Sequence, residues 1–240
     1  MRNSKLAMQS TREYLRRKKQ LNTDLYGITA SAFSNGRDNV SIAGELIDAG
    51  IRIIQYREKD LSGMEMYREC QKIRQITAGA GALFIVNDHI DLALAVDADG
   101  VHIGQDDMPP DAVRQLIGPD RILGISTHSP EQARNAIAAG ADYLGVGPIY
   151  KTYTKKDVCA PVGLDYLKYA VENVNIPFVA IGGIKRHNLE TVLDQGAGLI
   201  ALVTEITEAE NIGERVREIR AIINGRNQHV SDTTGSSEIR

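Results

Sequence analysis

The feature that most constrains this chain is a regular alternation of short apolar runs with helix-period segments, which begins at Leu25 and continues almost to the end. The runs are nearly continuous in apolar residues, as is typical of parallel strands covered on both faces. We predict eight such strands, at Leu25–Thr29, Arg52–Arg57, Leu83–Asn87, Gly100–Gly104, Arg121–Ser126, Tyr143–Gly147, Phe178–Gly182 and Gly198–Thr204. Eight strand–helix alternations without a domain-sized gap predict an α/β fold, a single (β/α)8 TIM barrel; a doubly wound open sheet is the alternative.

The segments between the strands carry amphipathic helix patterns, for example at Gly63–Thr77, Pro130–Ala139 and His187–Gln195. The first two patterns end near Gly79 and Gly140, and glycine is a common helix stop. The length of 240 residues is close to the ~250 that a barrel of this kind typically needs. One catalytic barrel domain therefore accounts for most of the chain.

An N-terminal helical extension is predicted at residues 1–24, before the first strand. The stretch Ser10–Gln20 has the pattern of a basic helix that starts with a capping box formed by Ser10 and Glu13. We expect this helix to close the bottom of the barrel. The alternative is a phosphate-rich or membrane-surface partner for the basic run Arg16–Lys19.

The barrel is predicted at residues 25–224, and the polar residues 225–240 are predicted to be a disordered tail.

The composition excludes several classes of protein. The net charge of −3 gives no reason to expect nucleic acid as a partner, and no apolar run approaches the ~18 residues of a membrane span. Cys70 and Cys159 lack the spacing of a metal site and indicate a reducing compartment, so we expect a cytoplasmic protein.

Reactive side chains gather where the predicted strands end, which is where barrel enzymes place their active sites. These groups are Gln55–Lys59, Asn87–Asp88, Gln105–Asp107, Ser126–His128, Gly147–Lys156, Gly182–Gly183 and Val203–Glu205. Asp88 and Asp107 follow neighbouring strands, and two carboxylates can hold a hard cation such as Mg²⁺. Cationic side chains at the same rim would neutralise phosphate oxygens. The pattern therefore indicates a Mg²⁺–diphosphate site, with a second phosphate site at the glycines and hydroxyl of strands seven and eight.

Each of these residues taken alone has a simpler interpretation. Asp88 is placed to cap a helix, and Asp107 belongs to a turn. Lys155 and its neighbour Lys156 suit a solvated loop, and His128 suits capping or packing. The glycines of strand seven suit a tight turn. The joint placement of all of them at one rim is what favours a functional site.

Seven motifs in register give the chain a resemblance to a known family. They are QYREK, VND, DGVHIGQDD, GISTH, GADYLGVGPIYKTYTKK with the following PVG, and VAIGGI. From about Leu25 to Ile223 the sequence resembles thiamine-phosphate synthase (thiamine-phosphate pyrophosphorylase). The resemblance implies a transferase of thiamine biosynthesis that joins 4-amino-2-methyl-5-hydroxymethylpyrimidine diphosphate to 4-methyl-5-(2-phosphoethyl)-thiazole, giving thiamine monophosphate and diphosphate.

The resemblance also assigns roles to individual residues. The pyrimidine diphosphate would be bound by Gln55, Tyr56, Arg57, Glu58, Lys59, Asn87, Ser126 and Lys155. The thiazole phosphate would be bound by Thr152, Thr154, Gly183, Val203 and Thr204. Mg²⁺ would be bound by Asp88 and Asp107, and the catalytic residues would be Arg57, Lys59, Ser126 and Lys155. The implied mechanism is Mg²⁺-assisted dissociative loss of diphosphate followed by capture of the pyrimidine cation by the thiazole nitrogen.

Two other functions remain open at this point. A thiazole tautomerase on the same barrel would use a histidine such as His128, although the chain keeps both metal carboxylates and the QYREK run. A non-catalytic regulatory binding protein of the thiamine pathway would be expected to have lost those carboxylates. We expect small-molecule substrates as partners and a possible homo-oligomer.

Overall fold

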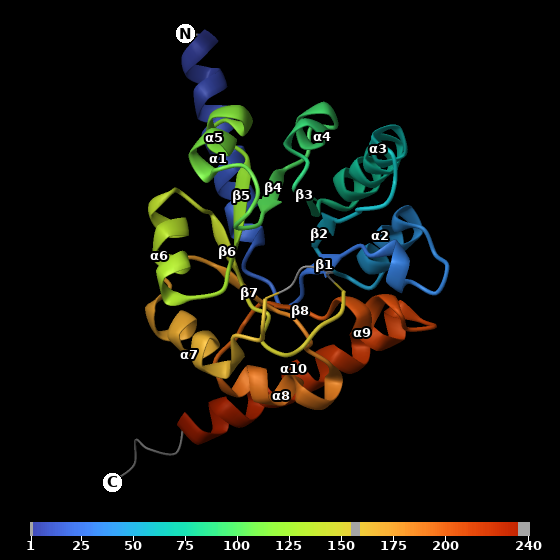
Figure 1. The fold of residues 1–240 in the computed structure, drawn as a ribbon, viewed down its shortest axis with the longest axis vertical. Helices are drawn as coiled ribbons and strands as arrows, with labels where there is room; N and C mark the ends of the chain where they lie inside the picture. Colours follow the sequence, from blue (N-terminus) through green and yellow to red (C-terminus); the bar gives the residue numbers. More distant parts are fainter. Residues whose placement is uncertain (1, 155–158, 235–240) are drawn as a thin grey trace.

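A computed structural model describes the backbone of residues 2–154 and 159–234 and the side chains of residues 11–154 and 159–226. It contains one parallel sheet of eight strands in sequential order (Figure 1). The strands are β1 (Gly27–Ile28), β2 (Ile53–Tyr56), β3 (Leu83–Asn87), β4 (Gly100–Ile103), β5 (Ile122–Thr127), β6 (Tyr143–Val146), β7 (Phe178–Ile181) and β8 (Ile200–Ala201). Leu25 forms a parallel bridge with Ile200, and the N–H of Tyr26 donates to the carbonyl of Ile200 at 3.0 Å. The sheet therefore closes on itself, which confirms the TIM barrel.

Helices follow the strands and form a ring around them (Figure 1). They are α2 (Asn39–Asp48), α3 (Gly63–Ala80), α4 (Ile90–Ala95), α5 (Pro110–Ile117), α6 (Pro130–Ala138), α7 (Gly163–Asn173), α8 (Arg186–Asp194), α9 (Val203–Thr207) and α10 (Ile212–Thr234), with a 3₁₀ turn, η1, at Ser31–Phe33. None of the helices in the described part of the chain combines the length and apolar character needed to cross a membrane.

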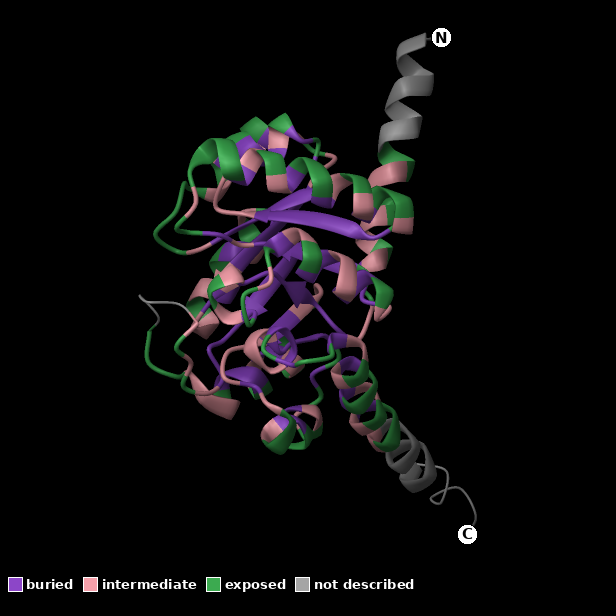
Figure 2. Cartoon of the chain, turned by 90° about the vertical axis from the view of Figure 1, so that its right-hand side faces the viewer, coloured by how far each residue is buried: buried purple, intermediate pink, exposed green. Residues whose placement is uncertain are grey.

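The core has two layers because side chains alternate between the two faces of each strand. Alternate residues such as Ile53, Leu83 and Ile85 pack with one another inside the barrel. Their neighbours, such as Ile54 and Phe84, pack outward against the helices. The strands are accordingly buried along almost their whole length, whereas the helices carry exposed outer faces (Figure 2). This alternation also decides which residues at the strand ends face the inside of the barrel.

Helix α3 shows how local sequence sets the boundaries of an element. Ser62 accepts a hydrogen bond from the N–H of Glu65, whose side chain accepts from the N–H of Ser62, so the two form a capping box. The helix ends at Ala80, and the next residue, Gly81, adopts a left-handed conformation with φ of 64°. The prediction that this helix ends near Gly79 is confirmed, but the glycine that provides the left-handed cap is Gly81.

The N-terminal extension forms one helix, α1 (Arg2–Gln20), which lies against the N-terminal ends of the strands. Two carboxylates that directly precede strands, Asp99 before β4 and Asp142 before β6, anchor it. Arg17 pairs with Asp99 at 3.0 Å, Lys18 pairs with Asp142 at 3.2 Å, and Tyr14 donates to Asp142 at 2.5 Å. These contacts confirm that the helix closes the bottom of the barrel.

Two details at the chain ends differ from the sequence-based expectation. The predicted capping box at Ser10 and Glu13 was wrong because α1 begins at Arg2, and the Glu13 side chain instead accepts from Arg16 at 2.6 Å. Helix α10 continues to Thr234, inside residues 225–240, which were predicted to be disordered. Extension of an existing helix needs no new nucleus, so polar residues can prolong one that packing has established. Residues 235–240 lie outside the described part of the chain.

Candidate active site

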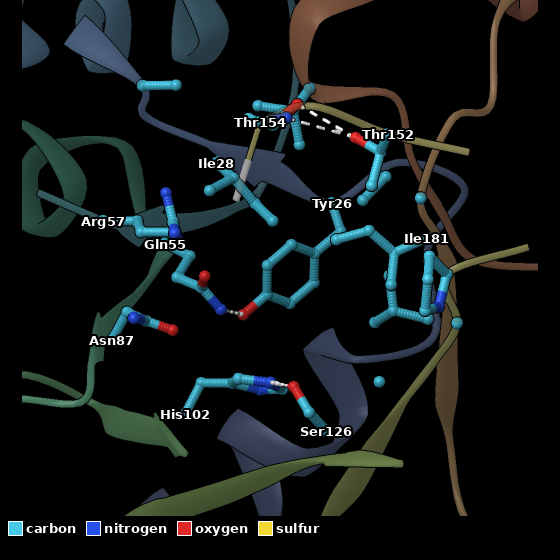
Figure 3. A pocket seen from close by; sticks show the side chains of 18 of the residues that line it. Tyr26, Ile28, Gln55, Arg57, Asn87, His102, Ser126, Thr152, Thr154 and Ile181 are labelled. Carbon is cyan, nitrogen blue, oxygen red and sulfur yellow. Dashed lines mark hydrogen bonds between the residues drawn. The ribbon is translucent and has the colours of Figure 1, made fainter. Parts of the chain in front are cut away.

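A cavity opens inside the barrel at the carboxyl ends of the strands (Figure 3). Most of the residues expected to bind substrate line it, and they come from elements far apart in the sequence. These lining residues are Gln55, Arg57, Lys59, Asn87, Asp88, Ser126, Thr152, Thr154, Gly183, Val203 and Thr204. The fold therefore brings both predicted phosphate sites to one cavity. Lys155, which the sequence assigns to the same site, lies outside the described residues.

Tyr56 and Glu58 belong to the same predicted run but do not line this cavity. The Tyr56 hydroxyl donates to Glu69 of α3 at 2.7 Å. Glu58 accepts from Ser31 at 2.5 Å and from Asn39 at 2.9 Å. Burial alone would raise the pKa of Glu58, but these hydrogen bonds, with two backbone N–H groups, hold it below the ordinary value. Both side chains therefore tie strand β2 to its surroundings while Gln55 and Arg57 face the cavity.

Asp88 lies at the rim of the cavity, directly after β3. It has a left-handed φ of 61°, and its carboxylate forms an ion pair with Lys59 at the end of β2. The expectation that Asp88 taken alone would cap a helix does not match the structure, because α4 begins at Ile90 after His89. The Asp88 side chain is thus left to face the cavity and its cation.

Asp107 follows β4, the strand next to β3, and holds the turn at the end of β4. Its Oδ2 atom accepts from the N–H of Gly104 at 2.6 Å, and Gly104 lines the cavity although Asp107 itself does not. The turn interpretation of Asp107 is therefore correct for that one oxygen. The same contact places the Asp107 carboxylate beside Gly104, a residue that lines the cavity.

A chain of hydrogen bonds joins residues that line the cavity inside the barrel, and it was not predicted from the sequence. Gln55 donates to the Tyr26 hydroxyl at 3.0 Å, and the Tyr26 and Tyr143 hydroxyls are 2.6 Å apart. His102 continues the chain, with Nδ1 2.9 Å from the Tyr143 hydroxyl and Nε2 2.9 Å from the Ser126 hydroxyl. Figure 3 shows Gln55 reaching Tyr26 on one side and His102 reaching Ser126 on the other. The network fixes the two predicted ligands Gln55 and Ser126 from below.

The aromatic members of this network fit because small residues face them. A Cβ at Gly124 would lie 2.2 Å from the Tyr143 ring, and one at Gly145 would lie 3.3 Å from the His102 ring. Burial raises the pKa of Tyr26 and of Tyr143, so both hydroxyls keep their protons at neutral pH. Alternation along the strands would have placed these three side chains inside the barrel, which was the available signal.

The opposite end of the cavity is built from the segment after β6 and the ends of β7 and β8. The hydroxyl oxygens of Thr152 and Thr154 lie 3.2 Å apart at this end of the cavity. Gly183 has a φ of 64°, and a Cβ on it would lie 2.5 Å from the carbonyl oxygen of Lys151, so only glycine allows this close approach. Residues predicted as the end of strand eight, including Thr204, instead begin the short helix α9. The strand prediction failed there because apolar runs of this length do not distinguish a strand from a helical turn.

His128 also lines the cavity, but its contacts are those of a packed side chain. Its Nδ1 donates to the carbonyl of Gly147 at 2.5 Å, and its N–H donates to Gln132 at 2.7 Å. Cys159 lines the cavity as well and is exposed. The contacts of His128 match the packing interpretation.

Comparison with known proteins identifies what the chain resembles. A family profile described as thiamine monophosphate synthase matches residues 25–206. Over 203 residues the chain is 60% identical to a thiamine-phosphate synthase of Pelotomaculum thermopropionicum, covering 85% of this chain and 93% of that protein. It is 55% identical over 203 residues to the Lawsonia intracellularis thiamine-phosphate synthase, covering 85% and 94%. A solved thiamine phosphate pyrophosphorylase from Pyrococcus furiosus superposes with a TM-score of 0.77 at 38% identity, covering 88% of this chain and 98% of that one.

Proposed function

Because the chain belongs to the thiamine monophosphate synthase family, we propose that it joins 4-amino-2-methyl-5-hydroxymethylpyrimidine diphosphate to 4-methyl-5-(2-phosphoethyl)-thiazole. The products are thiamine monophosphate and diphosphate, so the enzyme is a transferase. The observation that carries this proposal is the cavity itself, which places cations and a carboxylate at one end and glycine with threonine hydroxyls at the other. One cavity thus has a place for two different phosphate groups.

The diphosphate end of the cavity is formed by β2 and β3. Arg57 and Lys59 both line it, and the Lys59 side chain is 49% exposed, so its ammonium group is accessible to a ligand. Cations that face a departing diphosphate stabilise the charge that grows on it as the carbon–oxygen bond breaks. Asn87 at the end of β3 adds an amide, and Lys155 is assigned to the same group by sequence.

Mg²⁺ fits the donor set at this end. Asp88 and Asp107 offer hard carboxylate oxygens from neighbouring strand ends, as this ion prefers. Among the residues that the structure describes, no group of three or more His, Cys, Asp or Glu side chains is arranged as a metal cage. Two protein carboxylates suit Mg²⁺ nevertheless, because it usually keeps waters and substrate phosphates as its other ligands. When bound, the ion would supply charge neutralisation to the leaving diphosphate.

The pyrimidine lies, in this proposal, above the buried hydrogen-bond network. Gln55 and Ser126 face it, and their positions are fixed through Tyr26 and His102. The aminopyrimidine ring delocalises the positive charge left when diphosphate departs, so no protein nucleophile is needed. The thiazole nitrogen then captures the cation, which the barrel interior shields from water.

The proposal is tested by replacing the two carboxylates one at a time. Asp88→Ala and Asp107→Ala are each expected to lower kcat about a hundredfold, because each would remove one of the two proposed protein ligands of the metal. Asp91→Ala is the matched control, since Asp91 lies on the outer helix α4, is exposed and does not line the cavity. Unchanged kcat in either cavity variant would contradict the metal assignment.

The same assay separates the proposal from a thiazole tautomerase. A tautomerase would isomerise a thiazole substrate without pyrimidine diphosphate and without divalent metal, and it would depend on His128. Synthase activity instead requires both substrates. His128→Gln is therefore expected to alter the rate only modestly, because Gln can still donate to the carbonyl of Gly147 that His128 contacts.

A further inference from the structure

A lysine that does not itself line the cavity borders its thiazole-phosphate end. Lys185 precedes helix α8, and its Nζ atom donates to the Thr204 hydroxyl at 2.7 Å. Thr204 lines the cavity. The Lys185 side chain is 31% exposed, so its charge is only partly screened by water. A cation therefore lies one hydroxyl away from the proposed phosphate position.

The backbone around Lys185 is tied to the same end of the cavity. Its N–H donates to the side-chain oxygen of Asn188 at 2.8 Å, and the amide nitrogen of Asn188 donates to the carbonyl of Gly183 at 3.1 Å. Asn188 thus links Lys185 to the glycine that lines the cavity. This arrangement fixes the base of the lysine side chain relative to Thr204.

The charged side chains around Lys185 do not balance one another. Glu205 and Glu218 are each contacted by both Arg186 and Arg215, at distances between 2.6 and 3.2 Å. These four side chains form a closed group of two cations and two anions, with no net charge. Lys185 also pairs with Glu205, at 3.9 Å, which is longer than any of those contacts. With Lys185 included, the cluster has three cations and two anions and therefore one excess positive charge.

The Thr204 hydroxyl connects that charge to the cavity. A hydroxyl that accepts a hydrogen bond from an ammonium group still has its own hydrogen to donate. The bond from the cation polarises the hydroxyl and strengthens it as a donor. The positive charge and the stronger hydroxyl donor both favour binding of an anion with acceptor oxygens. They favour a dianion more than a monoanion.

We propose that Lys185, acting through Thr204, is a positioning residue that selects a doubly charged phosphate monoester over the corresponding uncharged alcohol at this end of the cavity. The inference deepens the proposed function, on which its choice of ligand rests. It predicts that the chain discriminates thiazole phosphate from the dephosphorylated thiazole alcohol largely through this one side chain.

The test measures binding of thiazole phosphate and of the thiazole alcohol by titration calorimetry, which needs no turnover. Lys185→Met is expected to raise the Kd of the phosphate about tenfold, equivalent to about 1.4 kcal/mol, and to leave the Kd of the alcohol within about twofold. Lys185→Arg is expected to retain most of the selectivity because it keeps the charge. Lys168→Met is the matched control, since Lys168 is an exposed lysine on α7 that does not line the cavity.

A pH series supplies a readout that a merely structural role would not change. The second proton of a phosphate monoester leaves near pH 6. Wild-type affinity for the phosphate is expected to rise between about pH 5 and pH 7.5 as the dianion forms, and Lys185→Met is expected to flatten that rise. Equal losses for phosphate and alcohol, or an unchanged preference, would overturn the inference. Wild-type protein that binds the phosphate selectively but forms no thiamine phosphate would contradict the proposed function and leave the inference standing.

Discussion

Removal of the Tyr143 hydroxyl tests the buried network most sharply. In Tyr143→Phe the ring and its packing remain, but the contacts to the Tyr26 hydroxyl at 2.6 Å and to His102 Nδ1 at 2.9 Å are lost. Each hydrogen bond contributes about 1 kcal/mol net, and a buried polar group left without a partner costs about 1–3 kcal/mol more. We therefore expect the free energy of unfolding to fall by about 3 kcal/mol.

The measurement is chemical denaturation followed by far-ultraviolet circular dichroism, together with the melting temperature. For a chain of this size about 3 kcal/mol corresponds to a melting temperature lower by roughly 6–12 °C. Tyr67→Phe is the matched control, because the Tyr67 hydroxyl accepts an exposed hydrogen bond from Gln71. We expect that control to change the stability by less than about 0.5 kcal/mol.

The Tyr143→Phe result also has a functional part. His102 loses its contact with the Tyr143 hydroxyl, so the orientation of its ring, and with it the position of the Ser126 hydroxyl, is less well fixed. The KM for pyrimidine diphosphate is expected to rise in consequence. A stability loss no larger than that of Tyr67→Phe would contradict this expectation, since it would mean that the buried hydroxyls contribute nothing through their contacts.

Three further outcomes are expected. Deletion of residues 1–20 removes the cations that pair with the carboxylates below β4 and β6, so we expect roughly 2–4 kcal/mol less stability by denaturation but an unchanged kcat; a folded and inactive truncation would contradict this. Burial raises the pKa of Tyr26 and Tyr143, so their contribution to stability is complete below about pH 10 and is lost above it, by up to about 1.4 kcal/mol per pH unit for each. A melting temperature that stays constant from pH 9 to 11 would argue against their burial. Gly124→Ala places a methyl group 2.2 Å from the Tyr143 ring and is expected to cost about 1–3 kcal/mol, whereas Gly79→Ala, with open space around it, should not destabilise the protein.

The fold followed from the sequence because its signal is repeated eight times. Differences at single boundaries, such as the cap at Gly81 in place of Gly79 and the helical turn at Thr204, left the count and order of strands unchanged. The boundary errors have local causes that a window of apolar residues does not contain. A left-handed backbone at Gly81 and a helical turn at Val203 depend on the packing around them.

The strand ends that form the site could be predicted from the sequence, but the direction in which each side chain points could not. The run from Gln55 to Lys59 was taken whole, although adjacent residues of a strand face opposite sides. Tyr56 and Glu58 consequently contact Glu69 and Ser31 outside the cavity. Contacts of Tyr56 and Glu58 with substrate remain predictions, and the positions of these two side chains do not support them.

The buried hydrogen-bond network was not predicted from the sequence for a different reason. His102 and Tyr143 belong to β4 and β6, and Tyr26 directly precedes β1. Each looks like an ordinary strand residue on its own. Their contacts depend on the register that pairs His102 with Gly124 and Gly124 with Tyr143 across β4, β5 and β6. Register of this kind arises from the closed barrel, so no short motif carries it.

The most direct test of the central claim is an assay of the purified full chain with pyrimidine diphosphate and thiazole phosphate, with and without Mg²⁺. Diphosphate and thiamine monophosphate are quantified separately over the same time course. We predict equal amounts of the two products, formed only when both substrates and the metal are present. Product formation that is unaffected by metal removal, or thiazole isomerisation without pyrimidine diphosphate, would contradict it.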